Sequence, residues 1–175
     1  NETSIETIIG DAIAKRIPEP AIDSTGEGVT VYVPRDAASR AAGADDVAAA
    51  FAKQKGVRVV RNGSWGMLWL EPMIEVATPQ GRIAYGPVLV DDVPSLLNAD
   101  VLNGGDHPLR LGITTELPWI KRQQRVTYQR VGVVDPRSAT DYEKNGGVKG
   151  LQRALSMSPS DVVTEVTDSG LRGRG

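Results

Sequence analysis

The sequence predicts an α/β fold in which helices pack against a small sheet, and three observations support this prediction. Residues 29–33 (VTVYV) are rich in β-branched side chains, which are typical of strands. Residues 44–55 repeat their apolar side chains at helical spacing. Two short apolar runs, 73–76 and 82–85, flank a Thr-Pro-Gln-Gly turn and predict a hairpin. Periodicity alone does not choose among the small α/β arrangements.

The elements up to residue 100 follow the order β-α-β-β-β-α. The helix over 44–55 has Asp45 and Asp46 in its first turn, where the helix dipole favours negative charge, and Gly56 as its expected C-cap. A strand over 57–60 follows it. After the hairpin, Asp92 is expected to cap a last helix, with Pro94 in its first turn and Leu96 and Leu97 facing inward.

Residues 1–28 precede this part of the chain, and residues 101–138 and 139–175 follow it. Residues 1–28 predict a short helix, with an isoleucine stripe that ends before Pro18, and a linker. Residues 101–138 are interpreted as a connector because Gly-Gly, His-Pro and Leu-Pro steps break the pattern. Residues 139–175 predict three short helices at 139–144, 148–156 and 159–168. The last of these has Ser158 as N-cap, Pro159 in its first turn and Asp161 in a capping box.

Composition excludes several classes of protein. The chain has 175 residues, 40% hydrophobic and 24% charged, which is enough to bury a core. Its net charge of -2 argues against a protein that binds nucleic acid or a membrane surface. It contains no cysteine and a single histidine, which excludes disulfides, a cysteine nucleophile, cysteine-held zinc or iron–sulfur clusters and histidine-rich metal sites within it. No catalytic residue and no metal ligand is assigned in this chain. Without a membrane-spanning apolar run or a signal segment, a soluble, cytoplasmic protein is expected.

The connector is the one basic stretch of the chain. Between residues 107 and 137 there are six basic side chains and two acidic ones. We interpret this stretch as a docking strap or a solvated face. RNA binding, with Trp119 and Tyr128 as stacking groups, is the alternative.

The C-terminal Gly-Leu-Arg-Gly-Arg-Gly run carries the sharpest chemical signal. Glycines allow a backbone to approach an anion closely, and arginines neutralise its charge. A flexible Arg-Gly tail is the alternative interpretation. Since the chain begins at Asn1 without a methionine and stops inside this run, we expect it to be a fragment.

Residues 150–175 (GLQRALSMSPSDVVTEVTDSGLRGRG) resemble the lead-in to the flavin and NADH loop of the NADH-binding flavoprotein family. This family includes the flavoprotein subunit of respiratory complex I, diaphorase subunits of NAD-reducing hydrogenases and beta subunits of NAD-dependent formate dehydrogenases. The resemblance implies that Gly173, Arg174 and Gly175 begin the cofactor-binding loop. Residues 139–175 would then be the truncated start of an FMN/NADH-binding domain.

Residues 63–72 (GSWGMLWLEP) resemble the second cysteine loop of the thioredoxin-like [2Fe-2S] domain found upstream in this family. The cysteine positions are occupied by Ser64 and Leu68, and those of the first pair by Pro34 and Ser39. All four ligands are missing. The resemblance therefore implies that residues 29–100 form a thioredoxin-like domain without its iron–sulfur cluster, kept for packing and docking.

The cluster-free domain and its connector most resemble the formate dehydrogenase beta subunits. This implies that the full-length subunit holds FMN, NAD and a [4Fe-4S] cluster, and passes electrons from formate to NAD. Its partners would be a molybdenum or tungsten catalytic subunit and a [2Fe-2S] subunit. The fragment alone is expected to be inactive and to bind no cofactor stably. A diaphorase subunit of complex I or of an NAD-reducing hydrogenase, and a non-catalytic thioredoxin-like adaptor, are the alternatives.

Other candidate residues have simpler interpretations. Trp65 and Trp69 are expected to fill space beside the sheet, in the volume that a cluster would occupy; a partner-binding patch is the alternative. The aspartate pairs at 45–46 and 91–92 are expected to cap helices. His107 has no partner at catalytic spacing and is not expected to be catalytic.

Overall fold

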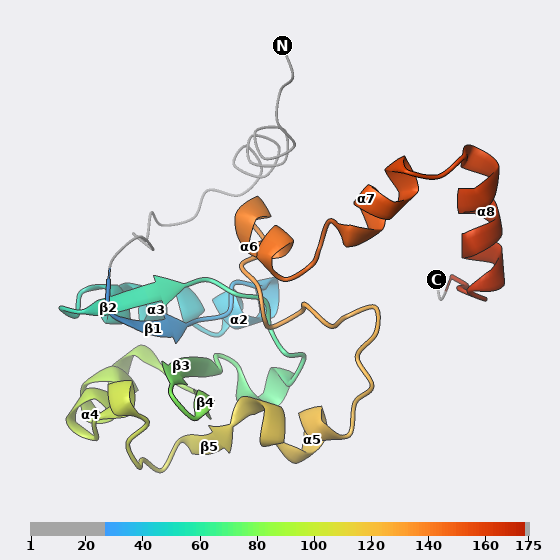
Figure 1. The fold of residues 1–175 in the computed structure, drawn as a ribbon. Helices are drawn as coiled ribbons and strands as arrows, with labels where there is room; N and C mark the ends of the chain where they lie inside the picture. The colour runs from blue at the N-terminus through green and yellow to red at the C-terminus, as the bar shows by residue number, and fades with distance from the viewer. Residues whose placement is uncertain (1–26, 174–175) are drawn as a thin grey trace.

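The structure, a computed structural model, describes residues 27–173 and contains one mixed five-stranded sheet. Its strand order is β2-β1-β3-β4-β5, in which β1 and β2 are parallel and the other neighbours antiparallel (Figure 1). The bounds are β1 Val29–Tyr32, β2 Val57–Val60, β3 Ile74–Thr78, β4 Gly81–Tyr85 and β5 Arg110–Ile113. The α/β prediction is confirmed.

Seven α-helices are present in the described part of the chain. Their bounds are α2 Ala37–Ala41, α3 Ala44–Ala52, α4 Val93–Asn98, α5 Pro118–Lys121, α6 Ala139–Lys144, α7 Lys149–Leu155 and α8 Pro159–Asp168. Up to α4, helices and strands follow the predicted β-α-β-β-β-α order, except that two helices, α2 and α3, stand between β1 and β2. The N-terminal helix predicted within residues 1–28 lies outside the described residues.

Two elements were not predicted. Helix α2 occupies a segment that was expected to be a loop. Gly43, at φ 101°, turns the chain between α2 and α3, and this left-handed conformation favours glycine. Strand β5 lies inside the predicted connector and pairs with β4 through Ile83↔Ile113 and Ala84↔Gly112. The sheet therefore continues beyond residue 100. The helix end at Gly56 was also misplaced, since α3 ends at Ala52.

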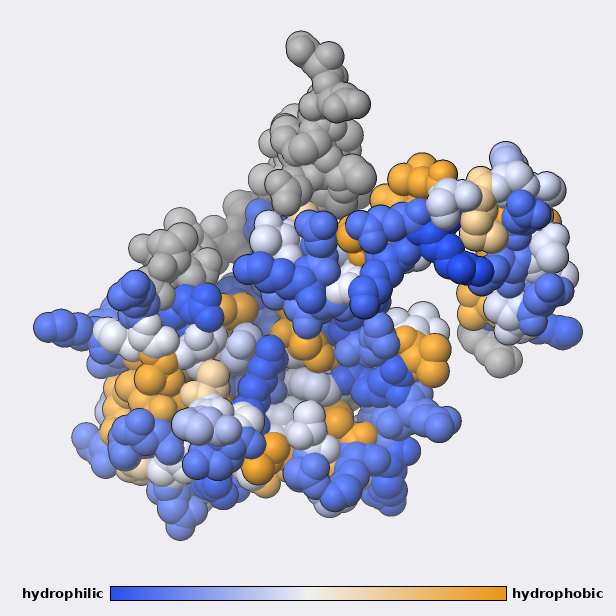
Figure 2. Space-filling model, in the orientation of Figure 1, coloured by the Kyte–Doolittle hydropathy of each residue, from blue (hydrophilic) through white to orange (hydrophobic). Residues whose placement is uncertain are grey.

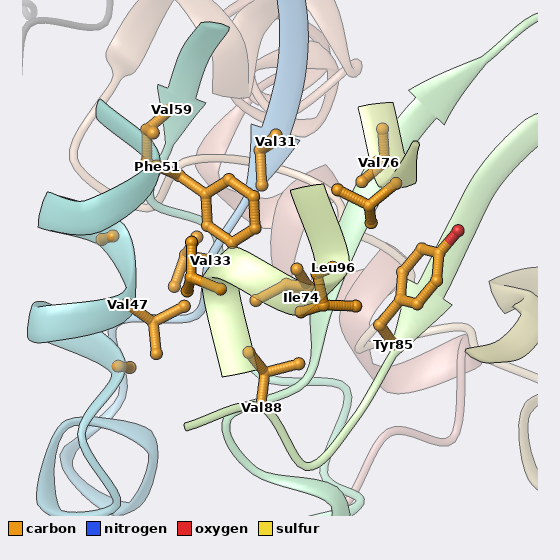
Figure 3. Close-up of a cluster of buried hydrophobic side chains, with 14 of the residues drawn as sticks. Val31, Val33, Val47, Phe51, Val59, Ile74, Val76, Tyr85, Val88 and Leu96 are labelled. Atoms are coloured by element: carbon orange, nitrogen blue, oxygen red, sulfur yellow. The ribbon is translucent and has the colours of Figure 1, made fainter. Parts of the chain in front are cut away.

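One face of the sheet carries the main core (Figure 3). Strands β1, β3 and β4 alternate their side chains, so that Val31, Ile74 and Tyr85 point to this face and are fully buried. Helices α3 and α4 cover it with Phe51 and Leu96. Leu96 faces inward as predicted, whereas Leu97 is only partly buried.

The opposite face is polar, and the connector covers it. The carbonyl oxygen of Gly132 accepts hydrogen bonds from Asn62 Nδ2 (2.8 Å) and Arg82 Nη1 (3.1 Å), and Arg82 Nη2 donates to Val133 O (2.9 Å). Gly132 has φ 80°, and a Cβ there would meet the Trp65 ring at 2.6 Å. The chain crosses closely over this face only because residue 132 is a glycine.

The C-terminal helices follow their sequence signals closely. Ser138 caps α6, and Ser158 caps α8 by accepting from Asp161 N at 3.2 Å while donating to its carboxylate at 2.7 Å. Helices α7 and α8 extend away from the sheet (Figure 1). Apolar side chains of these helices are exposed, as Figure 2 shows for this segment: Leu151, Leu155, Val163 and Val166. Leu171, which follows α8, is exposed as well.

Candidate functional site

Four positions of this chain match the cysteine ligands of the domain that residues 29–100 resemble. The structure brings two of them, Ser39 and Ser64, together. Ser39, on α2, donates to Glu71 Oε2 at 2.7 Å, and Ser64, in the loop after β2, donates to Glu71 Oε1 at 2.5 Å. All three side chains are buried. Pro34 is buried as well, whereas Leu68 is 62% exposed. We call Ser39, Ser64 and Glu71 the serine–glutamate site.

Backbone groups complete the serine–glutamate site. Glu71 Oε2 also accepts from Met73 N at 3.2 Å, so its carboxylate receives three hydrogen bonds. Ser64 Oγ accepts from Gly66 N at 2.9 Å, and Ser64 N donates to the Asp36 carboxylate. Each buried polar group here therefore has a partner, which is the condition for a stable buried polar network.

This arrangement does not fit a cluster or a metal ion. A thiolate-held cluster needs thiolates, and the positions carry two hydroxyls, a proline and an exposed leucine. Within residues 27–173 no three His, Cys, Asp or Glu side chains gather as a metal ligand set. The site can hold α2, the loop after β2 and the start of β3 together, which is a structural role.

Trp65 fills space beside the sheet, as predicted. Its Nε1 donates to Glu75 Oε2 at 2.9 Å, its ring packs on Gly132, and the Arg125 guanidinium lies 4.5 Å from the ring centroid. Trp69 behaves differently: it is 59% exposed and meets the half-exposed Trp119 edge to face, with centroids 5.3 Å apart. The space-filling prediction is wrong for Trp69.

Replacing Trp65 with alanine is expected to lower the free energy of unfolding by about 2 kcal/mol, because the ring is partly buried and its N–H pairs with a buried carboxylate. Urea denaturation of the two proteins measures the difference. Trp69→Ala is the matched control, and we expect it to change stability by less than about 1 kcal/mol since its ring is largely exposed. Equal losses for the two variants would contradict the assignment.

Glu75 is the most buried charged residue of the polar face, at 1% exposure. Asn62 Nδ2 and Trp65 Nε1 donate to its Oε2, and Arg82 Nη1 lies 3.6 Å from the same oxygen. Burial nevertheless dominates and raises the pKa of Glu75 above its ordinary value, against the lowering effects of Arg82 and of the Trp65, Thr114 and Asn62 side chains. Within the described residues its Oε1 has no hydrogen-bond partner.

The other predicted candidates have structural roles. Burial alone would raise the pKa of Asp45, but hydrogen bonds from Arg61 and Arg40 outweigh it and lower that pKa. Asp45 is thus an ion-pair partner rather than an acid–base catalyst. His107 accepts from Leu109 N at 3.2 Å and lies 3.1 Å from Ser95 Oγ. These contacts fix a loop.

The predicted cofactor loop is described only at its first residue. Gly173 is exposed, and a Cβ added to it would have no neighbour within 4 Å. Arg174 and Gly175 lie outside the described residues. Assignment of this loop to a cofactor stays a prediction. No helix among residues 27–173 is long and apolar enough to cross a membrane.

Comparison with known proteins supports the predicted class. Curated relatives match parts of the chain, and two of them are named as subunits of an NADP-reducing hydrogenase and of an NADH-quinone oxidoreductase. These matches support the resemblance to the NADH-binding flavoprotein family without singling out the formate dehydrogenases. No protein-family model matches the chain.

The first of these relatives is the HndC subunit of the NADP-reducing hydrogenase of Solidesulfovibrio fructosivorans, 46% identical over 55 residues. That segment is 31% of this chain and 11% of the relative. The second is a subunit of the NADH-quinone oxidoreductase of Streptomyces coelicolor, 50% identical over 34 residues, 19% of this chain and 8% of the relative. The matched segments thus span about a tenth of each relative's length.

Proposed function

We propose that this chain is the N-terminal part of the flavin- and NAD-binding subunit of an NAD-dependent formate dehydrogenase. In this function the subunit receives electrons that originate from formate and delivers them to NAD. The chain contributes a cluster-free docking domain, a connector and the entrance to the cofactor domain. Formate itself would be oxidised on a partner subunit with molybdenum or tungsten.

The observation that carries the proposal is the serine–glutamate site. Ser39 and Ser64 are two of the four positions that match the family's cysteines, and they lie 25 residues apart in the chain. Both hydroxyls contact the same Glu71 carboxylate. Convergence of these positions favours descent from a cluster-binding domain, and the loss of all four thiols favours a docking role for what remains.

The C-terminal helices provide the second argument. Exposed apolar side chains of α7 and α8, among them Leu155 and Val163, need a covering surface in the working protein. The two helices are tied to each other by a bidentate pair between Arg153 and Glu165, with N–O distances of 3.1 and 2.8 Å. Two helices with an uncovered apolar face are expected where they form the first segment of a larger domain that would pack against them.

The proposed cofactors supply the redox chemistry. Flavin exchanges electrons with one-electron carriers and hydride with nicotinamide, and the protein contributes binding and orientation. Of the proposed loop, Gly173 offers an open backbone without a side chain, which suits close approach to a phosphate.

The proposal is tested on the whole natural protein. The subunit that contains this sequence, purified with its partners from the source cells, is expected to contain FMN and to reduce NAD when formate is added. Flavin content is read by fluorescence after denaturation, and NADH formation by absorbance. A preparation that contains this chain but no flavin would overturn the flavoprotein assignment and favour the adaptor.

A diaphorase subunit of an NAD(P)-reducing hydrogenase is the second candidate. The match to a hydrogenase subunit, at 46% identity over 55 residues, favours it. The same preparation separates the two candidates: NAD or NADP reduction with hydrogen and not with formate would assign the hydrogenase.

Docking of this domain to a partner subunit is expected to use the exposed tryptophan pair. Trp69 and Trp119 meet edge to face, and the exposed Arg122 directly follows α5, where its Nε donates to Pro118 O. Exposed aromatic side chains and arginine are enriched among residues that dominate binding energy. Trp69→Ala and Arg122→Glu are each expected to weaken assembly about tenfold or more, measured by co-purification and by Kd with the purified partner subunit.

Leu89→Ala is the matched control for this docking test. Leu89 is also a largely exposed apolar residue, but it directly precedes the 3-10 turn Val90–Asp92 and α4, whereas Trp69 lies in the turn Leu68–Leu70 and Trp119 in α5. We expect it to leave assembly unchanged. Normal assembly of both docking variants would count against this surface.

A further inference from the structure

A cavity lies on the polar face of the sheet, between the sheet and α6, and nothing in the proposed function uses it. It is a cavity of about 240 Å³, lined by side chains from β1, β2 and β4 and by the segment from Val133 to Asn145. The serine–glutamate residues do not line it. Its volume exceeds the size of a few water molecules and suits a small organic ion.

Three cationic side chains enter this cavity from three different elements: Arg58 from β2, Arg82 from β4 and Lys144 from α6. Arg82 is held rigidly, because it donates to two connector carbonyls and its Cζ lies 3.5 Å from the centroid of the Tyr32 ring. Arg58 uses Nε and Nη2 on Thr30 Oγ1, at 3.1 and 2.7 Å. Two of the three cations are therefore preorganised.

The remaining donors of this cavity are open. Among residues 27–173, neither Arg58 Nη1 nor Lys144 Nζ has a hydrogen-bond acceptor or a carboxylate partner. A bound anion would give each of these two cationic groups an acceptor.

The two carboxylates of the cavity are already engaged. Asp135 Oδ1 accepts from Arg35 Nη1 at 3.0 Å and from Arg137 N at 2.9 Å. Asp141 Oδ2 accepts from Asp135 N at 2.8 Å, and its Oδ1 from Asn145 Nδ2 at 3.2 Å. Backbone and side-chain donors hold these carboxylates in place, and the three cationic side chains of the lining outnumber them by one.

From this geometry we propose that the cavity binds a small phosphate monoester. Open donors come from two elements, Arg58 on β2 and Lys144 on α6, and the Arg82 guanidinium on β4 adds a third positive charge. This charge suits the dianion of a phosphate monoester better than a singly charged carboxylate. The cavity is larger than a phosphate group alone, and the Tyr32 and Asn145 side chains in its lining offer polar contacts for a hydroxylated organic part. Such a ligand would join the sheet to α6.

The experiment uses the 175-residue chain and isothermal titration calorimetry at low salt. Glycerol 3-phosphate is the test ligand, inorganic phosphate shows whether the organic part contributes, and glycerol is the neutral control. The wild type is expected to bind glycerol 3-phosphate. Lys144→Gln, at an exposed helix position where misfolding is not expected, should weaken binding about tenfold, as loss of one charge-assisted contact does.

Lys53→Gln is the matched control because it removes the same charge at an exposed site outside the cavity. It should bind as the wild type does, and Arg58→Gln should bind as weakly as Lys144→Gln. Tighter binding of glycerol 3-phosphate than of phosphate supports a monoester site, and equal binding assigns the site to free phosphate instead. No binding of either, or equal binding by Lys144→Gln and Lys53→Gln, would overturn the proposal. These outcomes do not depend on flavin content and so are separate from the test of the proposed function.

Discussion

Replacing Glu71 with alanine is expected to lower the free energy of unfolding by about 3 to 4 kcal/mol, the largest loss among the variants considered, because three buried donors lose their acceptor. The Ser39 and Ser64 hydroxyls and the Met73 N–H all point to its carboxylate. These donors come from α2, the loop after β2 and the start of β3. Urea denaturation followed by circular dichroism measures the loss.

Two variants complete this test. Glu71→Gln keeps one acceptor oxygen, so its loss should lie between those of the wild type and the alanine variant. Glu116→Ala removes an exposed carboxylate that pairs with Lys121 at 2.5 Å, and such a pair contributes less than about 1 kcal/mol. If Glu71→Ala were as mild as Glu116→Ala, the serine–glutamate site would have no structural role.

The second large effect is a pH dependence that originates at Glu75. Burial raises the pKa of this carboxyl in the folded state above the ordinary value of 4.5. The folded protein therefore binds a proton that the unfolded chain releases, and this contribution to stability is complete below pH 4.5 and is lost as the pH rises through the raised pKa. Between the two pKa values the loss amounts to about 1.4 kcal/mol per pH unit.

Glu75→Gln isolates this contribution, since glutamine does not ionise. The stability of the variant relative to the wild type should increase as the pH rises from 4.5, and the increase should end once Glu75 is ionised in both states. Denaturant midpoints from acid to neutral pH measure it. A difference that stays constant over this range would show that Glu75 titrates as it does in the unfolded chain.

The sequence predicted the regular elements well where local signals were strong. The β-branched run of β1 and the Ser158-Pro159-Asp161 signature of α8 both led to elements with nearly the expected bounds. Helix α2 and strand β5 were missed because their stability comes from elsewhere. Ser39 on α2 is held by Glu71, and β5 is defined by its pairing with β4.

The candidate site was predictable in position but not in chemistry. The structure brings Ser39 and Ser64 together, two of the four positions that the resemblance matched to cysteines, yet Glu71 was noted only as the residue before Pro72. Its partners are 32 and 7 residues away, so no local pattern connects them. A usable signal existed for Glu75, because a single acidic residue between Ile74 and Val76 indicates a strand face with polar partners. The exposed position of Trp69, by contrast, depends on the fold of the connector, which carries its ring partner Trp119.

The close crossing of the chain at Gly132 also determines which parts of the molecule can unfold locally. Its carbonyl is shared by Asn62 and Arg82, and its Cα lies against Trp65, so the connector cannot lift without exposing buried donors and an indole ring. The sheet and residues 132–134 therefore form one cooperative unit, whose amide hydrogens exchange with solvent only through global unfolding. Helices α7 and α8 lack such ties to the sheet among the described residues, and their amides exchange through local opening.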